Sequence, residues 1–305
     1  MIKIGMIGMS QGNAHPYSWT AIINGMFSRK ELDQAGFPAV SDYLEANQDT
    51  LGISGAKVTH IYCDDVAAAK SIARSGGIQT VVNRIEDFIG QVDAVILGRD
   101  DPENHLSMAK PLLDAQIPIF IDKPLSINQE DLQVYEQYVE KGGFLMSCSS
   151  MRYAGEVLAV KSSLKKLGDI QLLTVVGKKD WKKYGVHMVE ACMSLLNDPK
   201  PMSVQYLGKE DFDIVQLQIS PTCFASIHLI ADISGTFQMN VFGTQDWAHI
   251  DIKNSYAMFK ENILEFVKGL NQGKPTLDFD KTKNVICIIA GALESKKNGN
   301  IKIDL

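Results

Sequence analysis

Apolar runs typical of short buried strands alternate with helical patterns along the first half of this 305-residue chain. The strand patterns occupy residues 2–8, 57–63, 80–82, 92–97, 117–121 and 144–148. Strands that alternate with helices in this way predict a parallel, doubly wound sheet with helices on both faces. The first part of the chain is therefore expected to be an α/β domain of the Rossmann type.

The pattern changes after Met151, where strand patterns follow one another with only short turns between them. Consecutive strands at such spacing predict a mostly antiparallel, open sheet in an α+β domain. We expect one domain over residues 1–124 and a second domain over 125–305. The helix and strand of 125–150 are the part that could instead complete the first sheet. Residues 28–56 look like an insertion, which is either a functional lid or partner surface or a mere decoration.

Composition narrows the class of protein. The net charge of −6 argues against nucleic acid and membrane as partners. The five cysteines are scattered and form no C-x-x-C pair, so we expect no disulfide framework, no metal site and a cytoplasmic location. No apolar run approaches the roughly 20 residues of a membrane helix, and the N-terminus enters a strand pattern without a signal peptide.

Lys123 stands directly after the strand pattern of 117–121 and before Pro124. Proline biases the preceding residue toward extended geometry, which holds the lysine at the carboxyl end of a strand. Ligands of an open α/β sheet bind in the crevice outside these strand ends. Lys123 therefore faces a cofactor or a substrate, unless it merely extends into solvent.

The segment after the first strand is rich in small residues and precedes a helical pattern. A strand, a small-residue turn and a helix are the layout that holds a pyrophosphate. The glycine pattern G-x-G-x-x-G is degenerate, because serine and asparagine occupy its second and third positions. Ser10 either binds a phosphate or acts as an N-cap. The candidate cofactor-binding residues of this turn are Gly8, Ser10, Gly12 and Asn13.

Asp64 closes the second strand, where a dinucleotide fold binds the adenosine ribose. A carboxylate at this position repels a 2′-phosphate, which favours NAD over NADP. The alternative is that Asp64 and Asp65 only cap the following helix. His15 and Trp19, just after the glycine turn, are candidates for stacking on a sugar or a nicotinamide, although core packing explains Trp19 equally well.

Several motifs in the same order resemble the Gfo/Idh/MocA oxidoreductases, the relatives of glucose–fructose oxidoreductase and inositol dehydrogenase. Asp101-Pro102-Glu103-Asn104-His105 is similar to the loop after the fourth strand of that family. Asp122-Lys123-Pro124 resembles its Glu-Lys-Pro motif, and 185–190 resembles its Gly-x-His-x-x-Asp signature. The resemblance covers nearly the whole chain, and it implies a dinucleotide-binding domain over residues 1–124 and a substrate and oligomerisation domain over 125–305.

The resemblance implies hydride transfer between a bound NAD(P) and a sugar, a polyol or a sugar acid. It implies that Lys123 and His187 are catalytic, the histidine as the proton donor or acceptor. A base is needed as hydride leaves an alcohol, and histidine titrates near neutrality. It also places Asp101, Pro102, Asn104, His105 and Asp122 at the cofactor, although His105 could make only local hydrogen bonds. Lys183, Tyr184 and Glu190 are the further residues expected at the substrate.

Two departures from the family pattern keep other functions open. Lys183 stands four residues before His187, where relatives often carry an acid that orients the imidazole, and the glycine turn is eroded. The rival function is a sugar-binding or regulatory protein without redox chemistry, and a third is glycoside cleavage with transient oxidation. The lysines between 161 and 183 indicate either an acidic substrate or a solvated basic face. Relatives pair through the open face of the second sheet, which implies a homodimer or a homotetramer.

Overall fold

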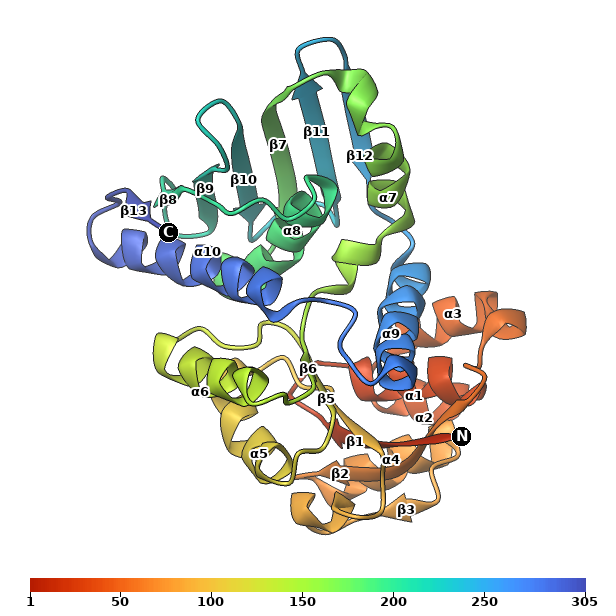
Figure 1. Ribbon diagram of the computed structural model, residues 1–305. Coiled ribbons are helices and arrows are strands. Elements are labelled where there is room, and N and C mark those ends of the chain that lie inside the picture. Colours follow the sequence, from red (N-terminus) through yellow and green to blue (C-terminus); the bar gives the residue numbers. More distant parts are fainter. The chain divides into compact units, whose positions relative to one another are not determined.

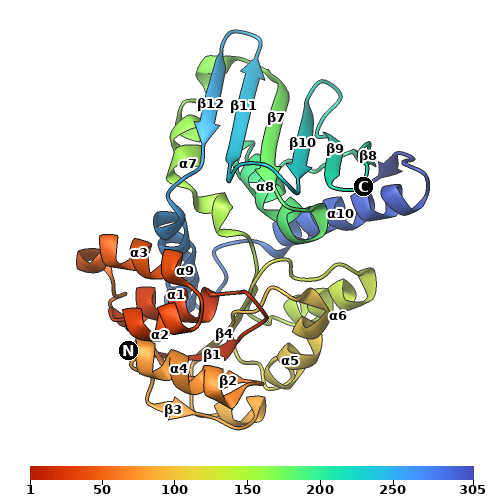
Figure 2. The same ribbon diagram turned by 180° about the vertical axis from the view of Figure 1, so that it is seen from behind.

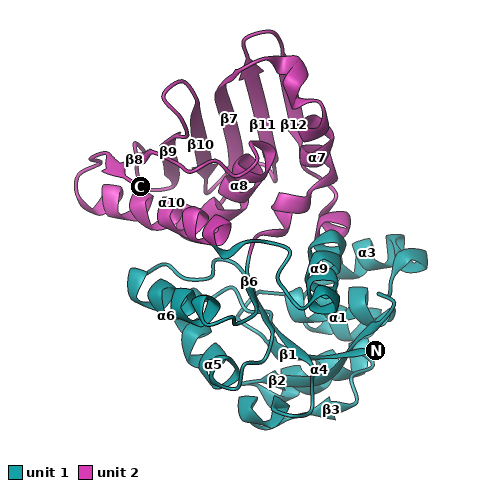
Figure 3. Cartoon of the chain, viewed as in Figure 1, with its two compact units in different colours: residues 1–147, 259–279 teal, residues 148–258, 280–305 magenta.

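The computed structural model describes residues 1–305, which form two compact units (Figure 3). Unit 1 consists of Met1–Ser147 and Phe259–Phe279, and unit 2 consists of Cys148–Met258 and Asp280–Leu305. The chain therefore leaves unit 1, builds most of unit 2, and returns to unit 1 for one helix before it ends in unit 2.

Unit 1 contains a six-stranded parallel sheet in the order β3-β2-β1-β4-β5-β6. The order reverses between β1 and β4, as in a doubly wound sheet, so the predicted fold of this part is confirmed. Pairing of β6 with β5 places residues 145 and 146 in this sheet. The strands are β1 (Ile2–Gly8), β2 (Ala56–Cys63), β3 (Thr80–Val81), β4 (Ala94–Leu97), β5 (Ile119–Ile121) and β6 (Leu145–Met146).

Helices cover both faces of this sheet (Figures 1 and 2). Helices α1 (His15–Asn24) and α4 (Val66–Gly76) pack on each other and on β2, while α5 (Pro102–Asp114) packs on β5. Helix α6 (Gln129–Glu140) connects β5 to β6, and the short helix η2 (Ile85–Phe88) connects β3 to β4. Helices thus follow the strands of this sheet, as the alternating patterns predict.

The insertion at 28–56 is helical. It forms α2 (Arg29–Gln34), α3 (Pro38–Ala46) and the 3₁₀ helix η1 (Gln48–Thr50). Leu32 and Leu44 are fully buried, and the Tyr43 hydroxyl donates a 2.5 Å hydrogen bond to Ser18 on α1. These contacts hold the insertion against the rest of unit 1.

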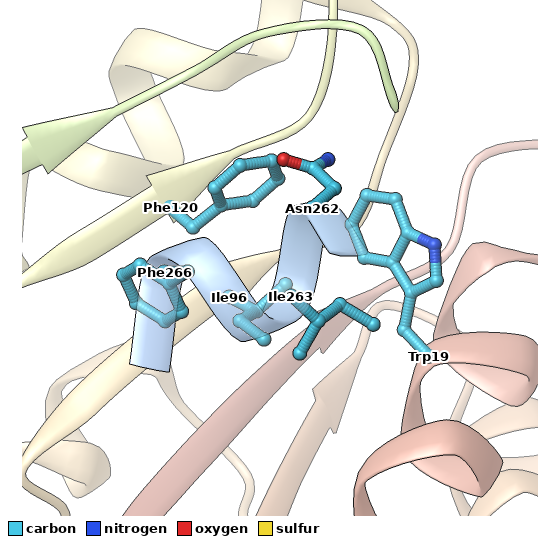
Figure 4. A pocket seen from close by; sticks show the side chains of 6 residues that line it. All are labelled: Trp19, Ile96, Phe120, Asn262, Ile263 and Phe266. Carbon is cyan, nitrogen blue, oxygen red and sulfur yellow. The ribbon is translucent and has the colours of Figure 1, made fainter. Parts of the chain in front are cut away.

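Helix α9 (Ser255–Gln272) supplies part of the core of unit 1 although it lies far along the chain. Figure 4 shows its side chains facing α1 and the sheet. The ring of Phe266 lies 5.7 Å from that of Phe120 on β5, and the space among these side chains is too small for a water molecule. The lining residues are Trp19, Ile96, Phe120, Asn262, Ile263 and Phe266.

Unit 2 contains a seven-stranded mixed sheet in the order β12-β11-β7-β10-β9-β8-β13. Only β7 and β10 pair in parallel, so the predicted mostly antiparallel sheet is confirmed. The strands are β7 (Ile170–Lys178), β8 (Ser203–Tyr206), β9 (Phe212–Gln218), β10 (Phe224–Ile230), β11 (Phe237–Gly243), β12 (Trp247–Asp251) and β13 (Ile303–Asp304).

Helices α7 (Gly155–Ser162), α8 (Trp181–Leu195) and α10 (Phe279–Lys297) lie on one side of this sheet (Figure 1). The short helices η3 (Ser150–Tyr153) and η4 (Leu164–Leu167) flank α7. On the opposite side, the strand register aligns a row of apolar side chains across four strands, namely Trp247, Phe242, Leu172 and Phe224. None of the helices combines the length and the apolar character that crossing a bilayer requires.

Candidate functional site

The candidate site of unit 1 lies where β1, β4 and β5 end. These strands are neighbours, so the turns that follow them meet at one edge of the sheet. The turns carry residues 9–14, 98–101 and 122–124. This edge is the place where ligands bind to an open α/β sheet.

Asp122 is the buried centre of this edge, with only 1% of its surface exposed. One carboxylate oxygen lies 2.5 Å from His15 Nδ1 and accepts a 3.3 Å hydrogen bond from the Asn13 side chain. The other oxygen accepts the Lys123 amide. Burial opposes ionisation, but the charges of His15 and Lys123 prevail and lower the pKa of Asp122 to about 2. Asp122 is therefore an ionised carboxylate that joins the β1–α1 turn to the end of β5.

Lys123 is also buried, with 5% of its surface exposed, and its peptide bond to Pro124 is cis. Its Nζ lies 3.8 Å from Asp100 Oδ2. The other Asp100 oxygen accepts a 2.5 Å hydrogen bond from Ser10, whose hydroxyl also accepts the Asp100 amide. A buried amine held among three turns is a suitable group for binding a hydroxyl of a ligand.

The small-residue turn allows α1 to approach β1 closely and leaves open space beside Gly12. An added Cβ on Gly8 would lie 2.6 Å from Pro16 Cγ, so glycine permits the close approach of α1 to β1. Gly12 has a φ of +76°, and an added Cβ there would meet no atom within 4 Å. The residues present therefore fit a bound phosphate, with open space at Gly12.

The N-cap alternative for Ser10 is wrong. Ala14 occupies the N-cap of α1, and this end of the helix has no side-chain cap hydrogen bond. The Ser10 hydroxyl is instead bonded to Asp100. A phosphate contact from Ser10 stays a prediction.

Arg99 joins the end of β4 to the end of β2, which no sequence pattern indicated. It binds the Asp101 carboxylate through two nitrogens, at 2.9 and 2.6 Å, and Asp64 through Nη1 at 2.6 Å. Asp101 also accepts a 2.7 Å hydrogen bond from Asn104. The hydrogen bond to Asp101 raises the pKa of Arg99 above its usual value. Asp64, the expected ribose ligand, therefore has a cationic partner in place.

Arg99 and Asp100 are the residues of this site that sequence reasoning missed. Both lie between the strand pattern of 92–97 and Asp101. Their position directly after a strand was the available signal, the same signal that drew attention to Lys123.

Two further residues expected at the cofactor, Pro102 and His105, are buried in the structure. Pro102 is the buried first residue of α5. His105 is fully buried, and its two ring nitrogens face the backbone carbonyls of Arg99 and Leu125 at 3.0 and 3.2 Å. Burial lowers the pKa of His105. Direct contact of these two residues with a cofactor stays a prediction.

His15 and Trp19 stack on each other, with ring centroids 4.4 Å apart and planes 13° apart. Trp19 is 1% exposed and lines the packed space beneath α9, so core packing accounts for its environment. His15 is partly exposed and bound to Asp122. A substrate contact from either residue stays a prediction.

In unit 2, His187 lies on α8 and is half-buried. Its Nδ1 lies 2.6 Å from the Ser149 hydroxyl, and its ring centroid lies 5.1 Å from that of Tyr184. Lys183 is exposed in the first turn of α8, where its amide binds the N-cap Asp180. Ser149 thus contacts the imidazole, and it too was missed because it lies 38 residues away in sequence.

Glu190 is buried one turn beyond His187 and pairs with Arg152 at 2.6 Å. Arg152 also binds Asp198 at 2.8 Å. Burial opposes the arginine charge, but the two carboxylates prevail and raise the pKa of Arg152. The Ser149 amide donates a 3.3 Å hydrogen bond to Glu190, so this ion cluster supports the residue that contacts His187. Substrate binding by Lys183, Tyr184 and Glu190 stays a prediction.

A doubly wound sheet with a glycine turn after β1 and an acid after β2 defines a dinucleotide-binding fold. Residues 2–149 match the model of the Gfo/Idh/MocA oxidoreductase family, described as an NAD-binding Rossmann fold. The match covers just under half of the chain, and it confirms the predicted resemblance to this family and the predicted NAD-binding fold.

Known proteins share the fold of the whole chain at low identity. The structure of GenD2 from gentamicin A biosynthesis, in complex with NAD, has 14% identity and a TM-score of 0.79, covering 100% of this chain and 96% of the other. Scyllo-inositol dehydrogenase from Lactobacillus casei, with bound NAD(H) and scyllo-inositol, has 13% identity and a TM-score of 0.78, covering 100% and 99%. At these identities, the likeness shows the fold.

A curated relative matches a shorter segment. It is provisionally named a UDP-kanosamine synthase oxidoreductase subunit, from Amycolatopsis mediterranei (strain S699), and is 34% identical over 107 residues. The matched segment is 35% of this chain and only 30% of the relative, so it spans about a third of each protein.

Proposed function

We propose that this protein is an NAD-dependent oxidoreductase that transfers hydride between nicotinamide and a carbon of a sugar, an inositol-like polyol or a sugar acid. The observation that carries the proposal is Lys123, a buried amine at the carboxyl end of β5 in an NAD-binding fold. The family match and the fold of the inositol dehydrogenase support the same class of reaction.

Bound NAD supplies the hydride acceptor for the oxidation of an alcohol. In this proposal, Lys123 holds a substrate hydroxyl and lowers its pKa, because a cation favours the alkoxide form. Asp122 and Asp100 hold the backbone and the amine of that lysine in place. His187, whose Nδ1 lies 2.6 Å from the Ser149 hydroxyl, accepts the proton.

The remaining roles are also proposals. Asp64 binds the adenosine ribose, and Gly8, Ser10, Gly12 and Asn13 hold the pyrophosphate. Inositols are the first substrates to test, because a solved protein of this fold contains scyllo-inositol.

Assembly and location complete the proposal. The apolar row on the open face of the unit 2 sheet, with Trp247 60% exposed, supports a homodimer or a homotetramer that covers it. The scattered cysteines, none of which forms a disulfide here, support a cytoplasmic location.

The test is a screen of inositols, sugars and sugar acids with NAD, in which turnover is measured by the absorbance of NADH. Lys123→Ala is expected to lower turnover of the best substrate by about 100-fold or more, as for loss of a positioned acid–base group. Lys110→Ala removes an exposed lysine of α5 and serves as the control. Unchanged turnover in a folded Lys123→Ala protein would contradict the role of this residue. Sugar binding without turnover would favour the non-catalytic alternative.

A further inference from the structure

The side chains of Asp64, Arg99 and Asp101 form a chain of charges across the ends of β2 and β4. Arg99 is the buried member, with 9% of its side chain exposed, and Asp101 holds it through two parallel hydrogen bonds. Asp64 is the outer member, with 55% of its side chain exposed, and it contacts only the Nη1 end of the guanidinium. Asp64 therefore lies between solvent and a fixed arginine.

The two carboxylates outnumber the guanidinium, so the group carries a net negative charge. A 2′-phosphate at the ribose position would meet Asp64 first and would be repelled. Without the Asp64 carboxylate, Asp101 would balance Arg99, and the Nη1 group would lack its present acceptor. Arginine forms charge-assisted hydrogen bonds with phosphate, and its planar shape suits such binding.

We propose that Arg99 forms a latent binding site for the adenosine 2′-phosphate of NADP, which Asp64 covers in the wild-type protein. Asp64 is the specificity-determining residue, and Arg99 is already positioned for the other cofactor by Asp101. Removal of one exposed carboxylate is then sufficient to admit NADP, without a new basic residue. This inference rests on the proposed function, because it requires the dinucleotide to bind at these strand ends.

The experiment is calorimetric titration with NAD and with NADP, which differ only in the 2′-phosphate. Asp64→Ala is expected to bind NADP about tenfold or more tightly than the wild type does, and to bind NAD more weakly. The double variant Asp64→Ala/Arg99→Gln is expected not to show the tighter NADP binding of Asp64→Ala. The control, Asp65→Asn, removes the same charge from the neighbouring residue, which caps α4 and does not contact Arg99. Its relative affinity for NAD and NADP should match that of the wild type.

The outcomes separate this inference from the proposed function. Binding of NAD by the wild type, with no gain of NADP binding in Asp64→Ala, would overturn the latent site alone. A gain that persists in the double variant would also overturn it, because Arg99 would not be the phosphate ligand. Binding of neither dinucleotide to any variant would overturn both proposals. Circular dichroism shows which variants are folded, and the single Asp64→Ala variant changes only an exposed side chain.

Discussion

Replacement of Asp122 by asparagine is expected to destabilise unit 1 in a way that depends on pH. The carboxyl pKa is lowered from 3.8 to about 2 by its cationic neighbours. A lowered pKa in the folded protein adds stability above the unfolded pKa, and this stability is lost as the pH falls toward the folded pKa. The shift corresponds to roughly 2 kcal/mol at pH 5 and to about half of that at pH 3.

The assay is urea unfolding of the wild type and of Asp122→Asn at pH 5 and at pH 3, with hydrogen exchange of the β5 amides as the local readout. This pH range is chosen because carboxyl groups titrate in it. The stability difference between the two proteins should shrink by about 1 kcal/mol at the lower pH. Asp114→Asn, which changes an exposed pair with Lys110, should show a difference below about 0.5 kcal/mol at both values.

An equal difference at pH 5 and pH 3 would refute the reasoning, since a structural defect alone does not titrate. The same conclusion would follow if Asp122→Asn were as stable as the wild type at pH 5. Either result would mean that the buried carboxylate gains nothing from its contact with His15.

Two further substitutions test the packing of each unit. Gly8→Ala should lower the melting temperature and weaken NAD binding, because the added Cβ would lie 2.6 Å from Pro16 Cγ. Gly155→Ala is the control, because open space surrounds that glycine. Equal melting temperatures of the two variants would contradict the prediction. Arg152→Met should destabilise unit 2 by about 3–5 kcal/mol in urea unfolding, because it leaves the buried carboxylate of Glu190 without its cation. A loss below about 1 kcal/mol would show that the ion pair is dispensable.

The sequence was sufficient for features that depend on local pattern. The alternation of strand and helix patterns predicted the parallel sheet, and consecutive strand patterns predicted the mostly antiparallel one. The position of Lys123 after a strand correctly placed it at the carboxyl end of β5. Topology then brings that end beside those of β4 and β1, which is where the candidate site lies.

Features that depend on distant contacts could not be predicted. Arg99 meets Asp64 because β2 and β4 both flank β1, and pairing of strands so far apart in sequence is not encoded in either segment alone. Helix α2 was missed because its six residues are too few to show a helical period. The sequence of α9 does not by itself show that Phe266 packs against Phe120 in unit 1.

The return of the chain to unit 1 for Phe259–Phe279 has a consequence for the order of synthesis. While the ribosome translates residues 148–258, the strands of the first sheet have already been synthesised. The helix that packs on Phe120 has not yet been synthesised. The apolar surface that α9 covers is therefore exposed on the nascent chain throughout that interval. That surface is covered only after Phe266 has left the exit tunnel and packs against Phe120.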